Sequence, residues 1–295
     1  MSEMSFILAL AAALPSPSVE RVIQVGETLS ARINGAPVDL RIDPAGLALP
    51  LIDRAAAERA KLGHSLLAMS YAVGPQKVTG DTAVATIDLG AGPAKRRVGW
   101  SERRFAEAAE GTIGPGGLPY AMVRFRLRPG SPKERTFTLP MADQSGLMGG
   151  WGGRFALVTI GGRPMRVVLD PYHRRTLATA GAAVRIAAAH GGTMKGAAGW
   201  EEIAFGVERP VREMALAQPL AIGPFSISSL GVRTGDFGNT AALSRGGADA
   251  DEVVVTAKAR HEARHDRINI GSDLLDRCSS ILFDNAHRQI TLTCA

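Results

Sequence analysis

Alternating apolar and polar positions predict two β-hairpins of the same design. Residues 32–44 (RINGAPVDLRIDP) and 159–171 (TIGGRPMRVVLDP) each contain two short alternating runs, joined by turn-forming residues. At a constant offset of 127 residues, Ile, Gly and Pro coincide, and both second strands run into Asp-Pro. An internal repeat of this kind indicates that the chain has two related halves.

Each predicted hairpin is followed by an Ala-rich stretch with helical character. Residues 51–62 end at Gly63, and residues 179–190 end at Gly191-Gly192. Glycine is a common residue at the end of a helix, because it adopts the left-handed conformation at little cost. We therefore expect a short helix after the hairpin in both halves.

A third feature closes each half. An Ile-Gly element begins at Ile113 and again at Ile270. Strand-like residues follow both of these elements: 121–127 in the first half, and 280–284 with 288–293 in the second.

The order of these features predicts the domain organisation. We expect an N-terminal lobe over 24–130 and a C-terminal lobe over 155–295. The intervening residues 131–154 are rich in glycine, which predicts a flexible linker. A length of 295 residues suits about two domains.

The repeated arrangement resembles that of the aspartic proteases, in their pepsin-like and retropepsin-like forms. Four features carry the resemblance. In each hairpin the second strand is largely apolar near its end and runs into Asp, and a helical stretch follows. The Ile-Gly-x-x-Leu-Leu element lies at 270–275, and the closing strands begin at Ile281. It covers most of residues 31–295. It implies an all-β, bilobal acid-protease fold with two pseudo-symmetric lobes and short helices.

The resemblance also implies a reaction. Each lobe of such a protein supplies one aspartate, so Asp43 and Asp170 would be the catalytic pair. Two carboxylates about 3 Å apart cannot both ionise, so they share a proton. The ionised one would activate a water, and the protonated one would donate to the peptide carbonyl. The implied function is an aspartic-type endopeptidase that acts on a peptide or protein and needs no cofactor.

Both Asp motifs depart from the family pattern, which has Thr or Ser and then Gly. Here Asp43 is followed by Pro44-Ala45-Gly46, and Asp170 is followed by Pro171-Tyr172-His173. Proline removes a backbone N–H, the bracing hydroxyl is missing, and Tyr172 would add a large side chain beside the cleft. The alternative hypothesis is a catalytically inactive peptide- or protein-binding module that keeps the cleft.

A flap over the cleft is expected between the helix and the Ile-Gly element of the first lobe. Residues 78–92 are the candidate, with Gly90-Ala91-Gly92 at the tip.

Charge and metal-ligand content exclude other classes of function. The net charge is +6, but the basic residues are scattered, and the longest run is Lys95-Arg96-Arg97, so we expect no nucleic-acid partner. His261 and His265 are four residues apart without a third ligand, and there are only two cysteines. We therefore expect no metal site.

The N-terminus and the cysteines bear on location. Residues 1–18 contain a short apolar run and then a Pro-Ser segment, which predicts a signal peptide and a periplasmic or secreted protein. The alternative is a cytoplasmic protein, and no segment reaches the ~18 apolar residues of a membrane span. If the chain is exported, a disulfide between Cys278 and Cys294 is expected; in the cytoplasm they would be buried thiols.

Overall fold

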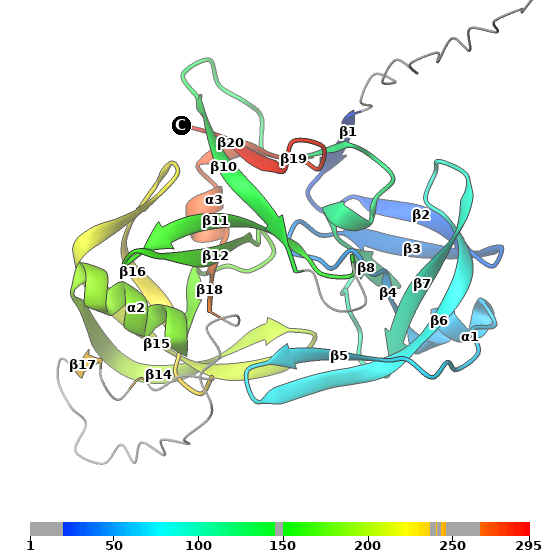
Figure 1. The fold of residues 1–295 in the computed structure, drawn as a ribbon, viewed down its shortest axis with the longest axis horizontal. Helices are drawn as coiled ribbons and strands as arrows, with labels where there is room; N and C mark the ends of the chain where they lie inside the picture. The colour runs from blue at the N-terminus through cyan, green and yellow to red at the C-terminus, as the bar shows by residue number, and fades with distance from the viewer. Residues whose placement is uncertain (1–19, 145–149, 237–239, 241–242, 246–265) are drawn as a thin grey trace, which may run out of the picture.

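The computed structural model describes residues 20–144, 150–236, 240, 243–245 and 266–295. The expected signal peptide (1–18) and the pair His261 and His265 lie outside these residues. Strands dominate, and they form two lobes joined by a shared sheet (Figure 1). The prediction of an all-β, two-lobed fold with short helices is therefore confirmed.

The N-terminal lobe contains seven strands: β2 (Thr28–Ile33), β3 (Ala36–Ile42), β4 (Leu51–Asp53), β5 (Ala68–Val73), β6 (Gln76–Asp88), β7 (Pro93–Ser101) and β8 (Gly111–Ile113). They form one sheet in the order β2-β3-β8-β4-β7-β6-β5. An additional pairing of β2 with β6 curls the sheet toward closure. A 3-10 turn, η1 (Pro115–Gly117), follows β8.

The C-terminal lobe repeats this order with strands of its own: β11 (Arg154–Ile160), β12 (Arg163–Leu169), β13 (Leu177–Thr179), β14 (Gly192–Ala204), β15 (Val207–Ile222), β16 (Phe225–Arg233) and β18 (Arg267–Ile270). Their order is β11-β12-β18-β13-β16-β15-β14, with the short β17 (Ser244–Arg245) beyond β14. The helix α3 (Ser272–Leu275) follows β18, as η1 follows β8. Each of the seven strands therefore has a counterpart in the other lobe.

The predicted hairpins form because their turn residues allow it. Asn34 and Gly35 have φ of +48° and +84°, and Gly161 and Gly162 have φ of +57° and +74°. Positive φ at both central residues is what a tight two-residue hairpin requires, and Gly and Asn adopt it readily. The two β-hairpins of the repeat therefore close locally.

The two Ala-rich stretches both form a helix, but the first begins later than predicted. Residues 51–53 form β4, because they pair with β7 and β8. Helix α1 (Arg54–Arg59) then begins after Asp53, whose Oδ1 accepts a hydrogen bond of 2.8 Å from the N–H of Ala56. Helix α2 (Ala180–His190) matches its prediction and ends at Gly191, with φ of +71°.

Strands from both halves form the sheet between the lobes: β1 (Glu20–Gln24), β9 (Met122–Arg126), β10 (Arg135–Asp143), β19 (Cys278–Asp284) and β20 (Gln289–Cys294). The strand β9 of the first half pairs with β19 of the second half along its whole length. The two halves are therefore held together by backbone hydrogen bonds as well as by side chains.

The segment 131–154 is more than the linker that its glycines predict. Residues Arg135–Asp143 form β10, which pairs with β20 on one side and with β11 on the other. The apolar residues Phe137, Leu139 and Met141 alternate with polar neighbours or proline, and this period of two is typical of a strand. The glycines lie in the later part of the segment, and residues 145–149 lie outside the described part of the chain.

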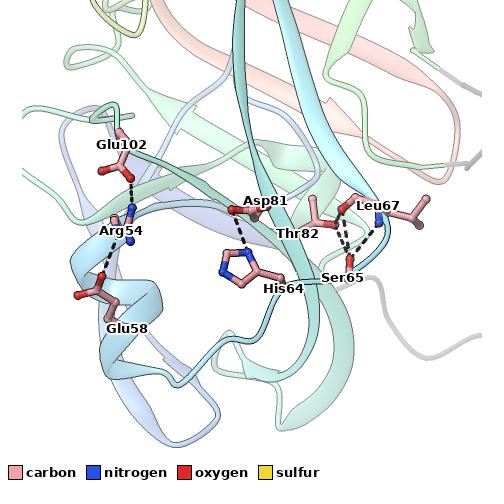
Figure 2. Close-up of polar contacts among 8 residues, drawn as sticks. All are labelled: Arg54, Glu58, His64, Ser65, Leu67, Asp81, Thr82 and Glu102. Carbon is pink, nitrogen blue, oxygen red and sulfur yellow. Dashed lines mark hydrogen bonds and ion pairs between the residues drawn. The ribbon is translucent and has the colours of Figure 1, made fainter.

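Polar contacts fasten the connection between α1 and β5 to strand β6. Figure 2 shows His64 Nδ1, which lies 3.2 Å from Asp81 Oδ2, and the Ser65 hydroxyl, which lies 3.3 Å from the Thr82 hydroxyl. The Thr82 hydroxyl also donates to the carbonyl of Leu67. These contacts hold the base from which hairpin β5–β6 extends toward the second lobe.

A disulfide joins Cys278, at the start of β19, to Cys294, at the end of β20. The two residues are cross-strand partners, and both are buried. The bond therefore closes the hairpin that contributes two of the strands in the shared sheet.

Replacing both cysteines by alanine is expected to lower the free energy of unfolding. The disulfide closes a loop with a sequence separation of 16 residues, and a loop of this length corresponds to about 3 kcal/mol. Urea unfolding of the oxidised wild-type chain and of the double variant measures the difference. Unchanged unfolding midpoints, with the wild-type disulfide verified by mass spectrometry, would contradict this expectation.

Candidate active site

The two Asp-Pro loops hold their aspartates in the same way. Asp43 follows β3, and its N–H donates to the carbonyl of Ile113 at 2.9 Å. Asp170 follows β12, and its N–H donates to the carbonyl of Ile270, also at 2.9 Å. Each Asp is thereby fastened to the Ile-Gly element of its own lobe. The repeat in the sequence is therefore also a repeat of backbone hydrogen bonds.

Backbone N–H groups further along each loop hold the carboxylates. The N–H of Ala45 donates to Asp43 Oδ1 at 2.8 Å. The N–H groups of Tyr172 and His173 hydrogen-bond to Asp170, the latter to Oδ1 at 3.2 Å. These residues supply donors that the preceding prolines cannot. The Asp-Pro loops are thus compatible with two oriented carboxylates.

Close backbone packing explains the glycines around the first loop. A Cβ atom at Gly46 would lie 3.0 Å from both the Asp43 carbonyl oxygen and the Gly114 nitrogen. A Cβ atom at Gly114 would lie 2.1 Å from the Gly46 carbonyl oxygen. In the second lobe, Gly271 of the Ile-Gly element packs in the same way against His173 and Arg175. No side chain fits between either Asp loop and its supporting element.

Both predicted site residues line one cavity of about 960 Å³, to which both lobes contribute. The Asp43 side chain is 14% exposed. Burial, and secondly the charge of Asp170, raise the pKa of Asp43 from 3.8 to about 6. Burial also raises the pKa of Asp170. The pair therefore retains a proton at a pH where an isolated Asp would have lost it.

The two carboxylates have different charged neighbours. Arg41 Nη2 lies 3.4 Å from Asp43 Oδ2, and this cation lowers the pKa of Asp43 against the larger effect of burial. Position 168 of β12, which corresponds to Arg41, is a valine. For Asp170, His173 lowers the pKa of the carboxyl, Arg41 lowers it to a smaller extent, and burial outweighs both. The pseudo-symmetry of the backbone is therefore not repeated by the side chains.

Tyr172 spans the two lobes. Its hydroxyl accepts a hydrogen bond from the N–H of Gly26 (3.0 Å) and donates to the carbonyl of Ile42 (3.3 Å). The Arg41 guanidinium stacks over its ring, 4.5 Å from the centroid. Ile42 directly precedes Asp43, so this hydroxyl connects the loop of one aspartate to the strand of the other. The Tyr172 side chain therefore lies across the boundary between the lobes. Its hydroxyl braces the lobes, although both Asp-Pro motifs lack a Ser or Thr hydroxyl.

Two hairpins, one from each lobe, meet beside the cavity. Phe205, at the tip of hairpin β14–β15, has its ring centroid 5.1 Å from that of Tyr71 and 4.9 Å from that of Phe105. Gly74, at the tip of hairpin β5–β6, packs against Asp236 of the second lobe. Figure 1 shows the two hairpins reaching toward each other along the lower side of the molecule.

The expectation of a flap over 78–92 is wrong. These residues, all of them described, form most of β6 and the turn before β7, and none of them lines the cavity. The hairpin tip that reaches the second lobe is Gly74-Pro75, between β5 and β6. The glycines at 90 and 92 do indicate a turn, but turn residues do not show in which direction a hairpin points.

Three residues that the sequence did not single out help to build the site: Arg41, His173 and Phe205. The ring of His173 contacts two carbonyls, that of Arg175 (Nδ1, 2.9 Å) and that of Glu202 on β14 (Nε2, 3.0 Å). It thus links the Asp170 loop to hairpin β14–β15. Arg41 and His173 lie within three residues of an aspartate, and this proximity is the only feature of the sequence that could have pointed to them. No such feature marks Phe205.

Within the described residues, no three or more His, Cys, Asp or Glu side chains are grouped so that they could hold a metal ion. No helix in the same part of the chain has the length and apolar character to cross a membrane.

No protein-family model matches the chain, and no curated protein matches its sequence. Among solved structures, the chain is similar to the aspartic proteinase from Irpex lacteus, at 10% sequence identity and a TM-score of 0.41. The similarity covers 91% of this chain and 94% of the other. It assigns no role to any residue of this chain.

Replacing Tyr172 by phenylalanine is expected to destabilise the junction between the lobes by about 1 kcal/mol, because the ring remains and the hydroxyl brace is lost. Urea unfolding measures the loss, and amide hydrogen exchange at Gly26 should accelerate. Tyr120→Phe is the matched control, since the Tyr120 hydroxyl makes no hydrogen bond with another described residue. Equal stability and equal exchange in the wild type and Tyr172→Phe would contradict the brace.

The raised pKa of Asp43 predicts a stability that falls as the pH rises. The folded state binds this proton more tightly than the unfolded state, so the contribution is complete below about pH 4 and is lost as the pH passes about 6. The loss corresponds to about 3 kcal/mol. In Asp43→Asn the fall should be smaller by about this amount, while the part due to the raised pKa of Asp170 remains. Urea unfolding at pH 4 to 7 tests this, and parallel profiles for the two proteins would contradict it.

Proposed function

We propose that the protein is an aspartic-type endopeptidase with Asp43 and Asp170 as its catalytic pair. The observation that supports this most is the burial of both carboxylates on one cavity, where the charge of Asp170 helps to raise the pKa of Asp43 to about 6. Strongly perturbed carboxyl groups in a cleft are candidates for acid–base chemistry. Two carboxylates that share one proton supply an acid and a base in the same place.

In the proposed reaction, the ionised carboxylate takes a proton from a water molecule. The water oxygen then forms a bond to the carbon of the peptide carbonyl, and the protonated carboxyl donates its proton to the carbonyl oxygen. The resulting tetrahedral intermediate breaks its C–N bond as the leaving nitrogen receives the proton that the pair holds, and one hydroxyl of the intermediate gives its proton back to the other carboxylate. Products are a carboxylic acid and an amine, and the aspartates return to their starting state.

The surrounding residues suit a peptide substrate. Apolar side chains of Leu47, Phe105 and Ile203 line the same cavity as the aspartates. Hydrophobic walls with a few placed polar groups are typical of ligand sites. The hairpins that meet at Phe205 and Tyr71 would have to separate, or move together, to admit and release a chain.

A peptide- or protein-binding module without catalysis is the second candidate. The contact of Arg41 with Asp43 favours it, because a permanent cation at 3.4 Å stabilises the ionised form of that carboxyl and opposes sharing of a proton. The effect of burial on the pKa of Asp43 is larger than that of Arg41, which is why we place the enzyme first.

The proposed location is the periplasm or the extracellular space. The Cys278–Cys294 disulfide supports it, since such bonds persist in oxidising compartments and are rare in the cytoplasm.

Asp43→Asn and Asp170→Asn are each expected to lower kcat/KM for peptide cleavage by at least about 100-fold, because each removes one half of the acid–base pair. Activity of the wild-type chain should fall as the pH rises through about 6, where the shared proton is lost. A peptide library incubated from pH 3 to 8, with cleavage read by mass spectrometry, measures both effects.

The control is Asp39→Asn, on the same strand as the Asp43 loop but exposed and outside the cavity. It should cleave like the wild type. Full activity in both catalytic-pair variants would refute the mechanism. Peptide binding by the wild-type chain without cleavage at any pH would instead identify the binding module.

A further inference from the structure

Arginine dominates the charged lining of the cavity. Eight arginines line it, against five carboxylates. When the catalytic pair retains one proton, four negative charges face eight positive ones, so the lining carries a net charge of about +4. No lysine takes part. The lining arginines are Arg41, Arg103, Arg104, Arg154, Arg166, Arg174, Arg175 and Arg267.

Some of these arginines already have carboxylate partners. Arg154 pairs with Asp143 at 2.8 Å. Arg175 pairs with two glutamates, Glu201 at 2.8 Å and Glu213 at 3.0 Å. Their charge is therefore largely balanced within the protein, and they serve to hold the cavity walls.

Arg104 and Arg174 are different. Both side chains are exposed, and neither makes a hydrogen bond or an ion pair with another described residue. Arg104 comes from the loop after β7 in the first lobe, and Arg174 follows Asp170 by four positions in the second. Arg103, next to Arg104 in the chain, donates to the carbonyls of Phe205 and Gly206, which are neutral acceptors and do not balance a positive charge.

Charge of this kind beside a partly enclosed cavity attracts anions. Low-dielectric walls focus the field of lining charges on the space between them. The planar guanidinium matches a carboxylate in a two-bond arrangement, which a lysine cannot do. The arginines are thus suited to acidic side chains of a bound peptide.

A nucleic acid fits this cavity less well. Strand-binding grooves combine a continuous basic track with aromatic faces on which bases stack. Here Glu107, Glu201 and Glu202 interrupt the arginines. The aromatic rings of Phe205 and Phe105 pack against each other rather than standing free.

We propose that the cleft selects peptides that carry an acidic side chain beside the bond facing Asp43 and Asp170, with Arg104 and Arg174 as the carboxylate-binding residues. This inference rests on the proposed function in naming the ligand as a peptide that occupies the Asp43–Asp170 cavity. It adds the substrate class and the residues that determine it.

The experiment measures binding separately from cleavage. Fluorescent peptides with an apolar centre are made in pairs that differ only in Glu or Gln at each flanking position. Fluorescence polarisation with the full chain carrying Asp170→Asn gives Kd without hydrolysis. The Glu peptide should bind roughly tenfold more tightly than its Gln partner at low salt. The difference should shrink as the salt concentration rises.

Matched variants locate the effect. Arg104→Gln and Arg174→Gln, each in the Asp170→Asn background, should lose several-fold of the preference for Glu without weakening the Gln peptide. Arg163→Gln, at an exposed position of β12 outside the cavity, is the control and should change nothing. Circular dichroism spectra and urea midpoints establish that each variant is folded.

Equal Kd values for the Glu and Gln peptides would overturn the inference, and so would tighter binding of a single-stranded oligonucleotide than of the acidic peptide. The failure of the proposed hydrolysis is distinguishable. Acid-selective binding with no cleavage by the wild-type chain would refute the enzyme and support the selectivity, whereas cleavage without any acid preference would do the reverse.

Discussion

Burial of two carboxylates in one cavity between the lobes is the constraint on which the rest of this structure depends. Two like charges taken out of water repel each other, and they are tolerated only when a proton is shared and the remaining oxygens are bonded. Backbone N–H donors of the Asp loops meet this need at Asp43 and Asp170. The glycines that let these loops pack against the Ile-Gly elements serve the same end.

Asp43 and Asp170 come from different lobes, so they stay close only if the position of one lobe relative to the other is fixed. The pairing of β9 with β19 fixes this position at the level of the backbone, and the Tyr172 hydroxyl fixes it beside the aspartates. Tyr172, the large residue that follows Asp170-Pro171, therefore joins the lobes rather than disrupting the site. Aromatic contacts of Phe205 with Tyr71 and Phe105 join them again on the hairpin side.

The backbone of the site is pseudo-symmetric, whereas its electrostatics are not. Arg41 lies beside one aspartate, and His173 lies near the other. A symmetric pair can exchange its proton between equivalent positions, but different neighbours distinguish the two carboxyls and set which conditions protonate them. Beyond the pair, arginines also outnumber carboxylates in the cavity lining.

Features that depend on neighbouring residues were predictable from the sequence. The Asn34-Gly35 and Gly161-Gly162 turns, the helix that ends at Gly191, and the strands that lead into Asp43 and Asp170 all follow from local conformational preference and from the alternation of buried positions. The repeat then indicated two lobes, because equal order along the chain implies equal folds. Only the tertiary structure decided which partner each segment met. Residues 51–53 became β4 and residues 135–143 became β10 because a strand was available beside them. Tyr172 and Phe205 acquired their roles from residues far along the chain, and contacts of that kind leave no periodic trace in a single sequence.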